Sequence, residues 1–287
     1  MRAILDRELK AYFRGPTGYV FSAFLLLFVG IYTMVYNLKS YLANFEYVLD
    51  SMSFVFMIII PFLTMRMISE DRKQKTDQLL YSLPMSTSKI VLGKYFASLL
   101  VLALPTAIMC VYPIILYMYG TINFLTAYSS ILAFFLLGAS LIAVGMFISS
   151  TTESQVVAAI LSFIAILVNF FVSDLANFIS SSSTASFIAM AIAVLLLALI
   201  IKILTKNGLF AVILAIACEA VLALLLYTKP AIFEGLFPSI LKGFSLFERF
   251  YRFVGGMFDL TSIVYFAMVS MIFIYLTVQS LEKRRWN

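Results

Sequence analysis

The residues that could do chemistry in this chain are few. It has no His, and its two Cys residues, Cys110 and Cys218, lie inside apolar runs without a metal-ligand spacing. Gly93-Lys94 lacks the upstream Gly and the following Ser or Thr of a phosphate-binding loop. No H-E-x-x-H, C-x-x-C or G-x-S-x-G motif occurs. The sequence therefore predicts no catalytic residues, no metal site and no cofactor bound by this chain.

One acidic residue, Glu219, lies in the middle of an apolar run. An ionisable side chain within a membrane span is by default a hypothesis for a functional site. The alternative is a lone acid that is neutralised by a proton or by a neighbouring hydroxyl. Glu219 and Asp174 form no evident catalytic pair, which disfavours a membrane-embedded enzyme. Glu219 therefore stays a candidate intramembrane polar site.

The densest charge lies in the segment MRMISEDRKQKTDQLLYSLPMSTSK, residues 65–89, where seven charged residues fall between Arg66 and Asp77. Thr76 can cap a short helix, and Asp77 places negative charge at its positive end. The body of this helix runs from Gln78 to Leu83, and Pro84 ends it. Its apolar face, Leu79, Leu80 and Leu83, indicates a docking element, although a simple connection between two helices remains open.

The composition indicates that the elements that carry these residues lie in a bilayer. With 63% hydrophobic residues, 12% charged residues and a mean hydropathy of +1.05, the chain has too little polar surface for a soluble domain of its length. About 20 apolar residues cross a bilayer as a helix, and no run alternates as a barrel strand would. We predict an all-α polytopic membrane protein with about eight transmembrane helices, at Tyr19–Tyr36, Phe54–Met67, Ile90–Tyr119, Leu125–Ser149, Gln155–Val172, Phe187–Leu204, Leu209–Tyr227 and Leu260–Leu281.

The positive-inside rule predicts the orientation of these helices. With a cytoplasmic N-terminus, fifteen of the twenty Lys and Arg residues face the cytoplasm, and an even number of spans returns the basic C-terminus to that side. The net charge of +6 then needs no nucleic-acid partner. Residues 1–16 have the pattern of an amphipathic helix that lies flat on the inner membrane surface, with a disordered tail as the alternative.

Two further segments give expectations about packing. Gly138, Ser140 and Gly145 are small residues in the fourth span, which favours a place in the interior. In the last outer segment, the spacing predicts a helix that rests on the outer leaflet. Its apolar face would hold Phe244, Phe247, Phe250, Tyr251 and Val254.

The run SEDRKQKTDQLLYSLPMSTSKIVLGKYFA resembles the segment after the second span of ABC-2-type transporter permeases. It is similar especially to the branch that contains the gliding-motility permease GldF and NosY-like proteins. Lys75 stands where that family has Gly, and Gln78 stands where it has an acid. RELKAYFRGPTGYVF is similar to the family's elbow helix and its entry to the first span. The positions that match the family's pattern are Glu70, Asp71, Thr76, Leu79, Leu80, Pro84, Gly93 and Lys94.

The resemblance implies a membrane permease subunit that couples ATP hydrolysis by separate ATPase subunits to movement of a substrate, as an exporter, across the cytoplasmic membrane. It implies a second permease chain as homo- or heterodimer, ATP and Mg on the ATPase, and leaves an extracytoplasmic accessory protein open. The helix at residues 69–88 would couple to the ATPase. Its expected contact residues are Glu70, Asp71, Arg72, Thr76, Asp77, Gln78, Leu79, Leu80, Leu83 and Pro84, with Arg7 and Glu8 on the elbow helix.

The expected organisation follows from these elements. An elbow helix at 1–16 precedes five spans at 17–173, and an outer loop with an additional hairpin fills 174–228. An extracytoplasmic amphipathic segment at 229–259 then leads to the last span and basic tail at 260–287. The resemblance covers residues 1 to about 173 and 244–287, so the hairpin stands outside it. The alternative function is a membrane scaffold or anchor of an ATPase-driven motility or envelope machine that moves no solute.

Overall fold

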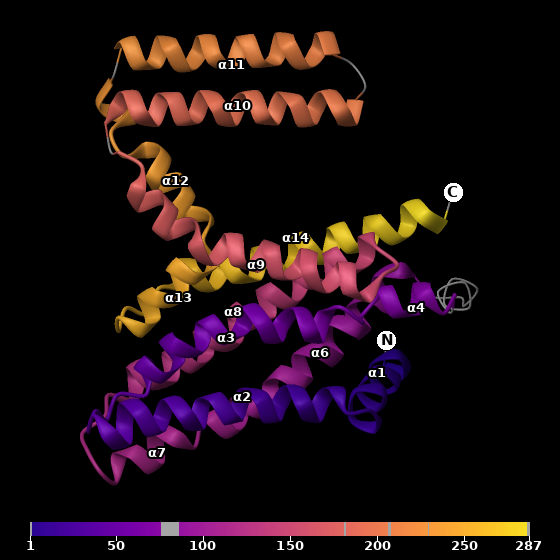
Figure 1. Cartoon of the computed structure of the whole chain (residues 1–287), viewed down its shortest axis with the longest axis vertical. Coiled ribbons are helices and arrows are strands. Elements are labelled where there is room, and N and C mark those ends of the chain that lie inside the picture. The colour runs from indigo at the N-terminus through magenta and orange to yellow at the C-terminus, as the bar shows by residue number, and fades with distance from the viewer. Residues whose placement is uncertain (1, 76–85, 181, 206–207, 229, 286–287) are drawn as a thin grey trace. The chain divides into compact units, whose positions relative to one another are not determined.

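The computed structural model describes residues 2–75, 86–180, 182–205, 208–228 and 230–285 (Figure 1). Within these ranges every regular element is a helix, which confirms the all-α prediction. The chain divides into two compact units. Unit 1 comprises Met1–Val168 and Arg249–Asn287, and unit 2 comprises Asn169–Glu248.

Unit 1 begins with the short amphipathic helix α1, followed by long apolar helices joined by short turns. The second of these, α2, continues into the π-helix η1. Two elements, α9 and α13, cross the boundary between the units. The helices of unit 1 are α1 Arg2–Arg14, α2 Thr17–Thr33, η1 Met34–Lys39, α3 Glu46–Thr64, α4 Ser69–Lys73, α6 Thr87–Met109, α7 Tyr112–Tyr117, α8 Phe124–Thr151, α9 Gln155–Phe178, α13 Leu246–Val254 and α14 Leu260–Arg285.

Six helical stretches among the described residues are long and apolar enough to cross a membrane, so the chain is a multi-pass membrane protein. They correspond to six of the eight predicted spans. The other two predicted spans form shorter apolar helices in the described residues, Ser183–Leu199 and Val212–Thr228. The six are Thr17–Lys39, Glu46–Lys73, Thr87–Tyr117, Phe124–Thr151, Gln155–Phe178 and Leu260–Arg284.

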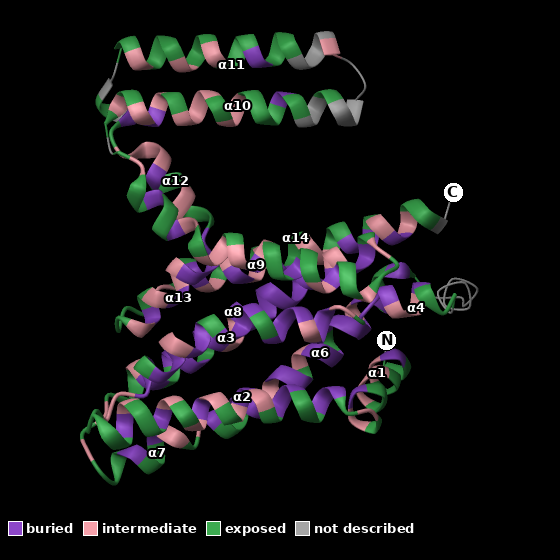
Figure 2. Cartoon of the chain, in the orientation of Figure 1, coloured by how far each residue is buried: buried purple, intermediate pink, exposed green. Residues whose placement is uncertain are grey.

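Helix α8 lies at the centre of unit 1 and packs against α3, α6 and α14. Its small residues allow this, as the sequence predicted. A Cβ atom on Gly145 would lie 2.8 Å from Cβ of Thr64 in α3, so only Gly permits the observed approach. Further along the same interface, the rings of Phe56 and Phe134 stack with centroids 4.2 Å apart. Most residues of α8 are buried (Figure 2).

Serine hydroxyls of α8 hold two other elements of unit 1 in register. Ser130 Oγ donates a hydrogen bond to the carbonyl of Phe253 at 3.1 Å, and Ser140 Oγ donates to the carbonyl of Phe266 in α14, also at 3.1 Å. Inside a bilayer such bonds stabilise helix association because water is not there to compete. The interior position of the fourth span is therefore fixed both by close approach and by polar contacts.

The two chain ends of unit 1 lie at one end of its bundle, together with α4 (Figure 1). Arg284 near the end of α14 is 3.2 Å from Glu153, which lies in the turn between α8 and α9. We call this end the basic end, because α1, α4 and the last turn of α14 all carry Lys or Arg. Under the positive-inside rule it is the end that we expect to face the cytoplasm.

Unit 2 contains an antiparallel hairpin of α10 (Ser183–Thr205) and α11 (Gly208–Thr228), followed by the 3-10 helix η2 (Pro230–Phe233) and α12 (Leu236–Phe244) (Figure 1). Helix α10 packs against α11, η2 and α12. Within the same unit, Asn169 of α9 anchors the chain after α12. Its side-chain amide donates to the carbonyl of Phe244 at 3.2 Å, and its Oδ1 accepts from the backbone N–H of Leu246 at 3.0 Å.

The prediction of one helix that rests on the outer leaflet in the last outer segment is wrong in two respects. The segment forms two helices, because Ser245 is extended and its Oγ caps the start of α13 by accepting from Glu248 N at 3.1 Å. Phe244 therefore lies outside α13 and is 66% exposed, whereas Phe247, Phe250 and Phe253 are fully buried. The aromatic face of α13 packs into the protein, with Phe250 against Phe134, and does not rest on lipid.

Candidate functional site

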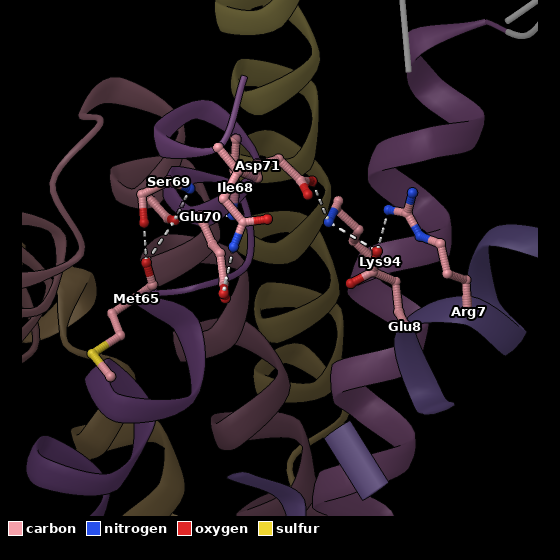
Figure 3. Close-up of polar contacts among 10 residues, drawn as sticks. Arg7, Glu8, Met65, Ile68, Ser69, Glu70, Asp71 and Lys94 are labelled. Carbon is pink, nitrogen blue, oxygen red and sulfur yellow. Dashed lines mark hydrogen bonds and ion pairs between the residues drawn. The ribbon is translucent and has the colours of Figure 1, made fainter. Parts of the chain in front are cut away.

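Lys94 lies at the centre of a polar junction at the basic end of unit 1 (Figure 3). Its Nζ is 3.0 Å from Glu8 Oε1 on α1 and 2.7 Å from Asp71 Oδ2 on α4. Lys94 itself stands two turns into α6. One ammonium group thus ties together the elbow helix, the start of the charged segment and the helix that follows that segment. We call these three residues the Lys94 junction.

The junction is shielded from water. The side chain of Lys94 is 6% exposed, that of Glu8 is 14% exposed and that of Asp71 is 21% exposed. Taking an ammonium out of water is costly unless carboxylates and hydrogen bonds replace its hydration. Lys94 has two such partners, and the loss of either would leave a buried charge poorly compensated. The position of α1 is thereby coupled to those of α4 and α6.

Arg7 and Tyr12 extend the junction along α1. Arg7 Nη2 is 2.6 Å from Glu8 Oε1. Partial burial lowers the pKa of Arg7, but the hydrogen bond to Glu8 and the charges of Glu8 and Asp71 outweigh it, so the pKa lies above its usual value. Burial raises the pKa of Tyr12, and the negative charges of Glu8 and Glu70 raise it further. The Tyr12 phenol therefore stays neutral at physiological pH.

Apolar contact supports the same arrangement. Ile4 of α1 and Ile90 of α6 are both buried and form one cluster. α1 packs against α6 and α2. The elbow helix is therefore held to α6 by a hydrophobic contact as well as by the ion pair with Lys94.

Helix α4 is held at its N-terminus by α8. The backbone N–H groups of Ile68 and Ser69 donate to Ser149 Oγ at 3.2 and 3.1 Å, so a side chain of a distant helix caps them. Ser149 Oγ in turn donates to the carbonyl of Met65 at 3.3 Å. Further along α4, Arg72 is 5% exposed. The chain therefore enters the charged segment from a fixed position.

The chain leaves α4 through a left-handed residue. Lys75 has φ of 55°, and its N–H donates to the carbonyl of Arg72 at 3.0 Å. A left-handed residue directly after a helix is the usual place for Gly, because a Cβ there is crowded by the backbone. The resemblance found in the sequence has Gly at this position. The left-handed conformation of this turn thus explains why the family has Gly at this position. Lys75 adopts the same conformation at a steric cost.

A cleft of about 350 Å³ lies between α1 and α4, beside the Lys94 junction. Its wall combines basic and acidic side chains with the end of the elbow helix. Arg66 is exposed on it, and Gln74 Nε2 donates to Glu70 Oε1 at 3.2 Å. The lining residues are Arg7, Glu8, Ala11, Tyr12, Gly15, Pro16, Thr17, Arg66, Met67, Glu70, Asp71, Gln74 and Lys94.

The structure brings together some of the residues that the sequence proposed for ATPase coupling. Arg7, Glu8, Glu70 and Asp71 line one cleft. Arg72 is buried in α4 and is not among the lining residues. The others lie outside the described residues, namely Thr76, Asp77, Gln78, Leu79, Leu80, Leu83 and Pro84. The described chain resumes at Ser86, and α6 begins at Thr87 with Ser86 as its extended N-cap residue.

Sequence reasoning did not assign a role to Lys94, Tyr12 or Ser149. Lys94 did carry a signal, since a Lys within an apolar run needs a partner. Ser149 carried none, because hydroxyl residues are common in membrane helices. Glu219 belongs to unit 2 and is not among the residues that line this cleft.

Comparison with known proteins assigns the family. The model described as "ABC-2 family transporter protein" matches residues 26–229, more than half of the chain. The matched range runs through α10 and α11, which the resemblance read from the sequence left out. Among curated proteins there is no match. Because the family model covers most of the membrane-spanning region, the chain belongs to the ABC-2 family of transporter proteins and is a membrane permease subunit of an ABC transporter.

Proposed function

We propose that this permease subunit couples ATP hydrolysis by separate ATPase subunits to the export of a substrate across the cytoplasmic membrane. Two permease chains and two ATPase subunits would form the complex, with ATP and Mg bound by the ATPases. Within the ABC-2 family, we place the chain in the branch of gliding-motility and NosY-like permeases, because of the motif at residues 69–97.

The observation that carries the coupling proposal is the Lys94 junction. Residues 76–83, the proposed coupling helix, are joined to α4 on one side and lead to α6 on the other. Asp71 lies five residues before this segment and Lys94 eleven residues after it, and the two side chains are paired at 2.7 Å. Both flanks of the coupling segment are therefore tied to each other and, through Glu8, to the elbow helix.

This geometry supports a mechanical role. When the ATPase subunits close on ATP, they would push on the coupling helix. If α4 and α6 moved independently, the displacement of the coupling helix would not reach the transmembrane helices. Because Lys94 holds α4, α6 and α1 together, the displacement passes to α6 and, through the Ser149 contact, to α8. Switching between conformations of the transporter requires a rigid connection between the coupling helix, where the ATPases push, and the transmembrane helices.

The first test is hydrolysis by the complex purified with its ATPase and reconstituted in lipid. Leu79→Asp and Leu80→Asp should abolish the stimulation of ATP hydrolysis by the permease, because a charge would interrupt the apolar docking face. Asp6→Asn, at an exposed position of α1, serves as the control and should leave stimulation unchanged. Unchanged stimulation in both Leu variants, with normal membrane insertion, would contradict the proposal.

A second test separates export from a scaffold role. Inside-out vesicles that contain the complex are supplied with ATP and a cell extract, and their contents are compared by mass spectrometry with vesicles supplied with a non-hydrolysable nucleotide. Export predicts at least one solute that accumulates only with ATP. Hydrolysis without accumulation of any solute would favour the scaffold or anchor of a motility or envelope machine.

A further inference from the structure

Unit 2 holds an acidic residue in the middle of an apolar helix. Glu219 lies eleven residues after Gly208, where α11 begins. At 1.5 Å per residue this is about 16 Å along the helix, close to half of a hydrocarbon core of about 30 Å. If the hairpin crosses the bilayer, Glu219 lies near its midplane. An acidic side chain at that depth costs about 3 kcal/mol or more unless a partner compensates it.

One oxygen of the Glu219 carboxyl has no such partner among the residues that the structure describes. Its Oε1 atom is buried and accepts no hydrogen bond from any residue that the structure describes. The hollow beside it is lined by Phe187 and by alanine and large aliphatic side chains of α10 and α11. A buried acceptor without a hydrogen bond is unfavourable, so the site is incomplete in the isolated chain.

A groove runs along the hairpin beside Glu219. Two adjoining hollows between α10 and α11, of about 430 and 280 Å³, share Leu195, Ala215 and Ile216 in their walls. Ala220 and Ala223 line the hollow next to Glu219. Small side chains at this spacing allow another helix to approach closely. The outward surfaces of both helices are largely exposed and apolar (Figure 2).

We propose that this groove is an assembly surface for a transmembrane helix of a partner protein that carries one Lys or Arg at the depth of Glu219. The groove supplies the apolar contact, and the carboxyl supplies the charge that selects the partner. An acyl chain would fill the groove but would leave Oε1 without a donor. A basic side chain on a packed helix satisfies both features at once.

A second copy of this chain does not fit the groove. Its Lys94 is already paired with Glu8 and Asp71. Lys202, the other Lys within a predicted span, lies only three residues before the end of α10. That places it about 12 Å from the depth of Glu219 in a parallel copy. The partner is therefore a different polypeptide, additional to the ATPase.

The test uses the full-length chain in lipid nanodiscs and synthetic transmembrane peptides. One Leu-Ala peptide carries a single central Lys, a second carries Leu at that position, and a third carries the Lys two turns nearer one end. Fluorescence energy transfer from labelled chain to labelled peptide measures the apparent Kd. We expect the central Lys peptide to bind at least tenfold more tightly than the other two.

Variants of the chain test the carboxyl of Glu219 and the apolar groove separately. Glu219→Gln keeps the size of the side chain and should abolish the preference for the Lys peptide. Ala223→Leu keeps the carboxyl but fills the groove, and should weaken binding of all three peptides. Neither variant should change stimulation of ATP hydrolysis, which separates this surface from the coupling site.

Three results would overturn the proposal. The first is equal binding of the Leu peptide and the central Lys peptide, which would indicate a lipid-facing groove. The second is an undiminished Lys preference in Glu219→Gln. The third is a change in the oligomeric state of the chain alone in Glu219→Gln, which would assign the groove to self-association.

Discussion

At the scale of single residues, two polar contacts of unit 1 join residues that are far apart in the sequence. Lys94 and Glu8 are separated by 86 positions and are joined at 3.0 Å. Ser149 caps α4 from 80 positions away. Such contacts constrain helix positions because their geometry is directional.

Removal of the Lys94 ammonium should destabilise the protein. We expect Lys94→Met to lower the free energy of unfolding by about 2–3 kcal/mol, since Glu8 and Asp71 would lose the ammonium group that they share but keep some contact with solvent. Lys89→Met, at an exposed position in the first turn of the same helix, should change it by less than about 0.5 kcal/mol. Thermal unfolding in detergent measures both, and equal effects would contradict a structural role for the junction.

A pH prediction concerns Asp259, which caps the start of α14. Hydrogen bonds from Thr261 and then from Ser262 lower the pKa of this carboxyl far below its usual value. A carboxyl whose pKa is lower in the folded state stabilises the fold above its unfolded pKa of about 3.9, and that contribution is lost as the pH falls toward the folded value.

Asp259→Ala should therefore cost about 1 kcal/mol at neutral pH, as for other N-cap residues that are replaced by Ala. Its stability should also change less than that of the wild type between pH 5 and pH 3, as followed by thermal unfolding. Parallel pH profiles for the two proteins would show that another carboxyl controls the acid response.

At the scale of elements, close approach of α8 and α3 depends on Gly145. Gly145→Ala should lower the free energy of unfolding by about 1–3 kcal/mol, because its methyl would overlap the Thr64 side chain of α3. Gly30→Ala in α2 is the matched control, since nothing lies within 4 Å of its Cβ position. The control should be neutral or stabilising by up to about 1 kcal/mol. A similar loss in both variants would contradict the explanation by close approach to Thr64.

The end of α4 gives a second prediction at this scale. Lys75→Gly should raise the free energy of unfolding by up to about 1 kcal/mol, because Gly adopts a φ of 55° without steric cost although it loses more backbone entropy. Lys73→Gly, at the last residue of α4, should lower it by up to about 1 kcal/mol. Urea or thermal unfolding of the pair tests the opposite signs. A loss in both variants would mean that the turn carries no strain.

At the scale of the whole molecule, both chain ends should lie on one side of the membrane. In a background without Cys110 and Cys218, single Cys residues at Lys10 and Lys283 should react with an impermeant thiol reagent from the same side. Single Cys residues at Lys39 and Lys242 should react from the other side. Lys202→Cys tests the predicted number of spans. The introduced Cys should react from the same side as position 10 only if the hairpin crosses the bilayer. Labelling of Lys10 and Lys283 from opposite sides would refute the predicted topology.

The sequence by itself determined the class of the protein. In a bilayer every backbone N–H and C=O must bond within its own segment, so apolar runs of sufficient length specify helices locally. That is why the positions of six of the eight predicted spans were predictable. The periodicity of residues 1–16 predicted the elbow helix at Arg2–Arg14, and small residues predicted the interior place of the fourth span. The motif around Glu70, Asp71 and Gly93-Lys94 pointed to the ABC-2 family, which the family match shows for the chain as a whole.

Only the tertiary structure decided which side chains meet. Lys94 pairs with Glu8 and Asp71, and the aromatic face of α13 packs into protein where the sequence had placed it on lipid. The physical reason is that the pattern of one helix identifies an apolar or polar face but not what covers it. That choice depends on close approach at small residues such as Gly145 and on turns such as Ser245, whose effects appear only when the helices are packed together.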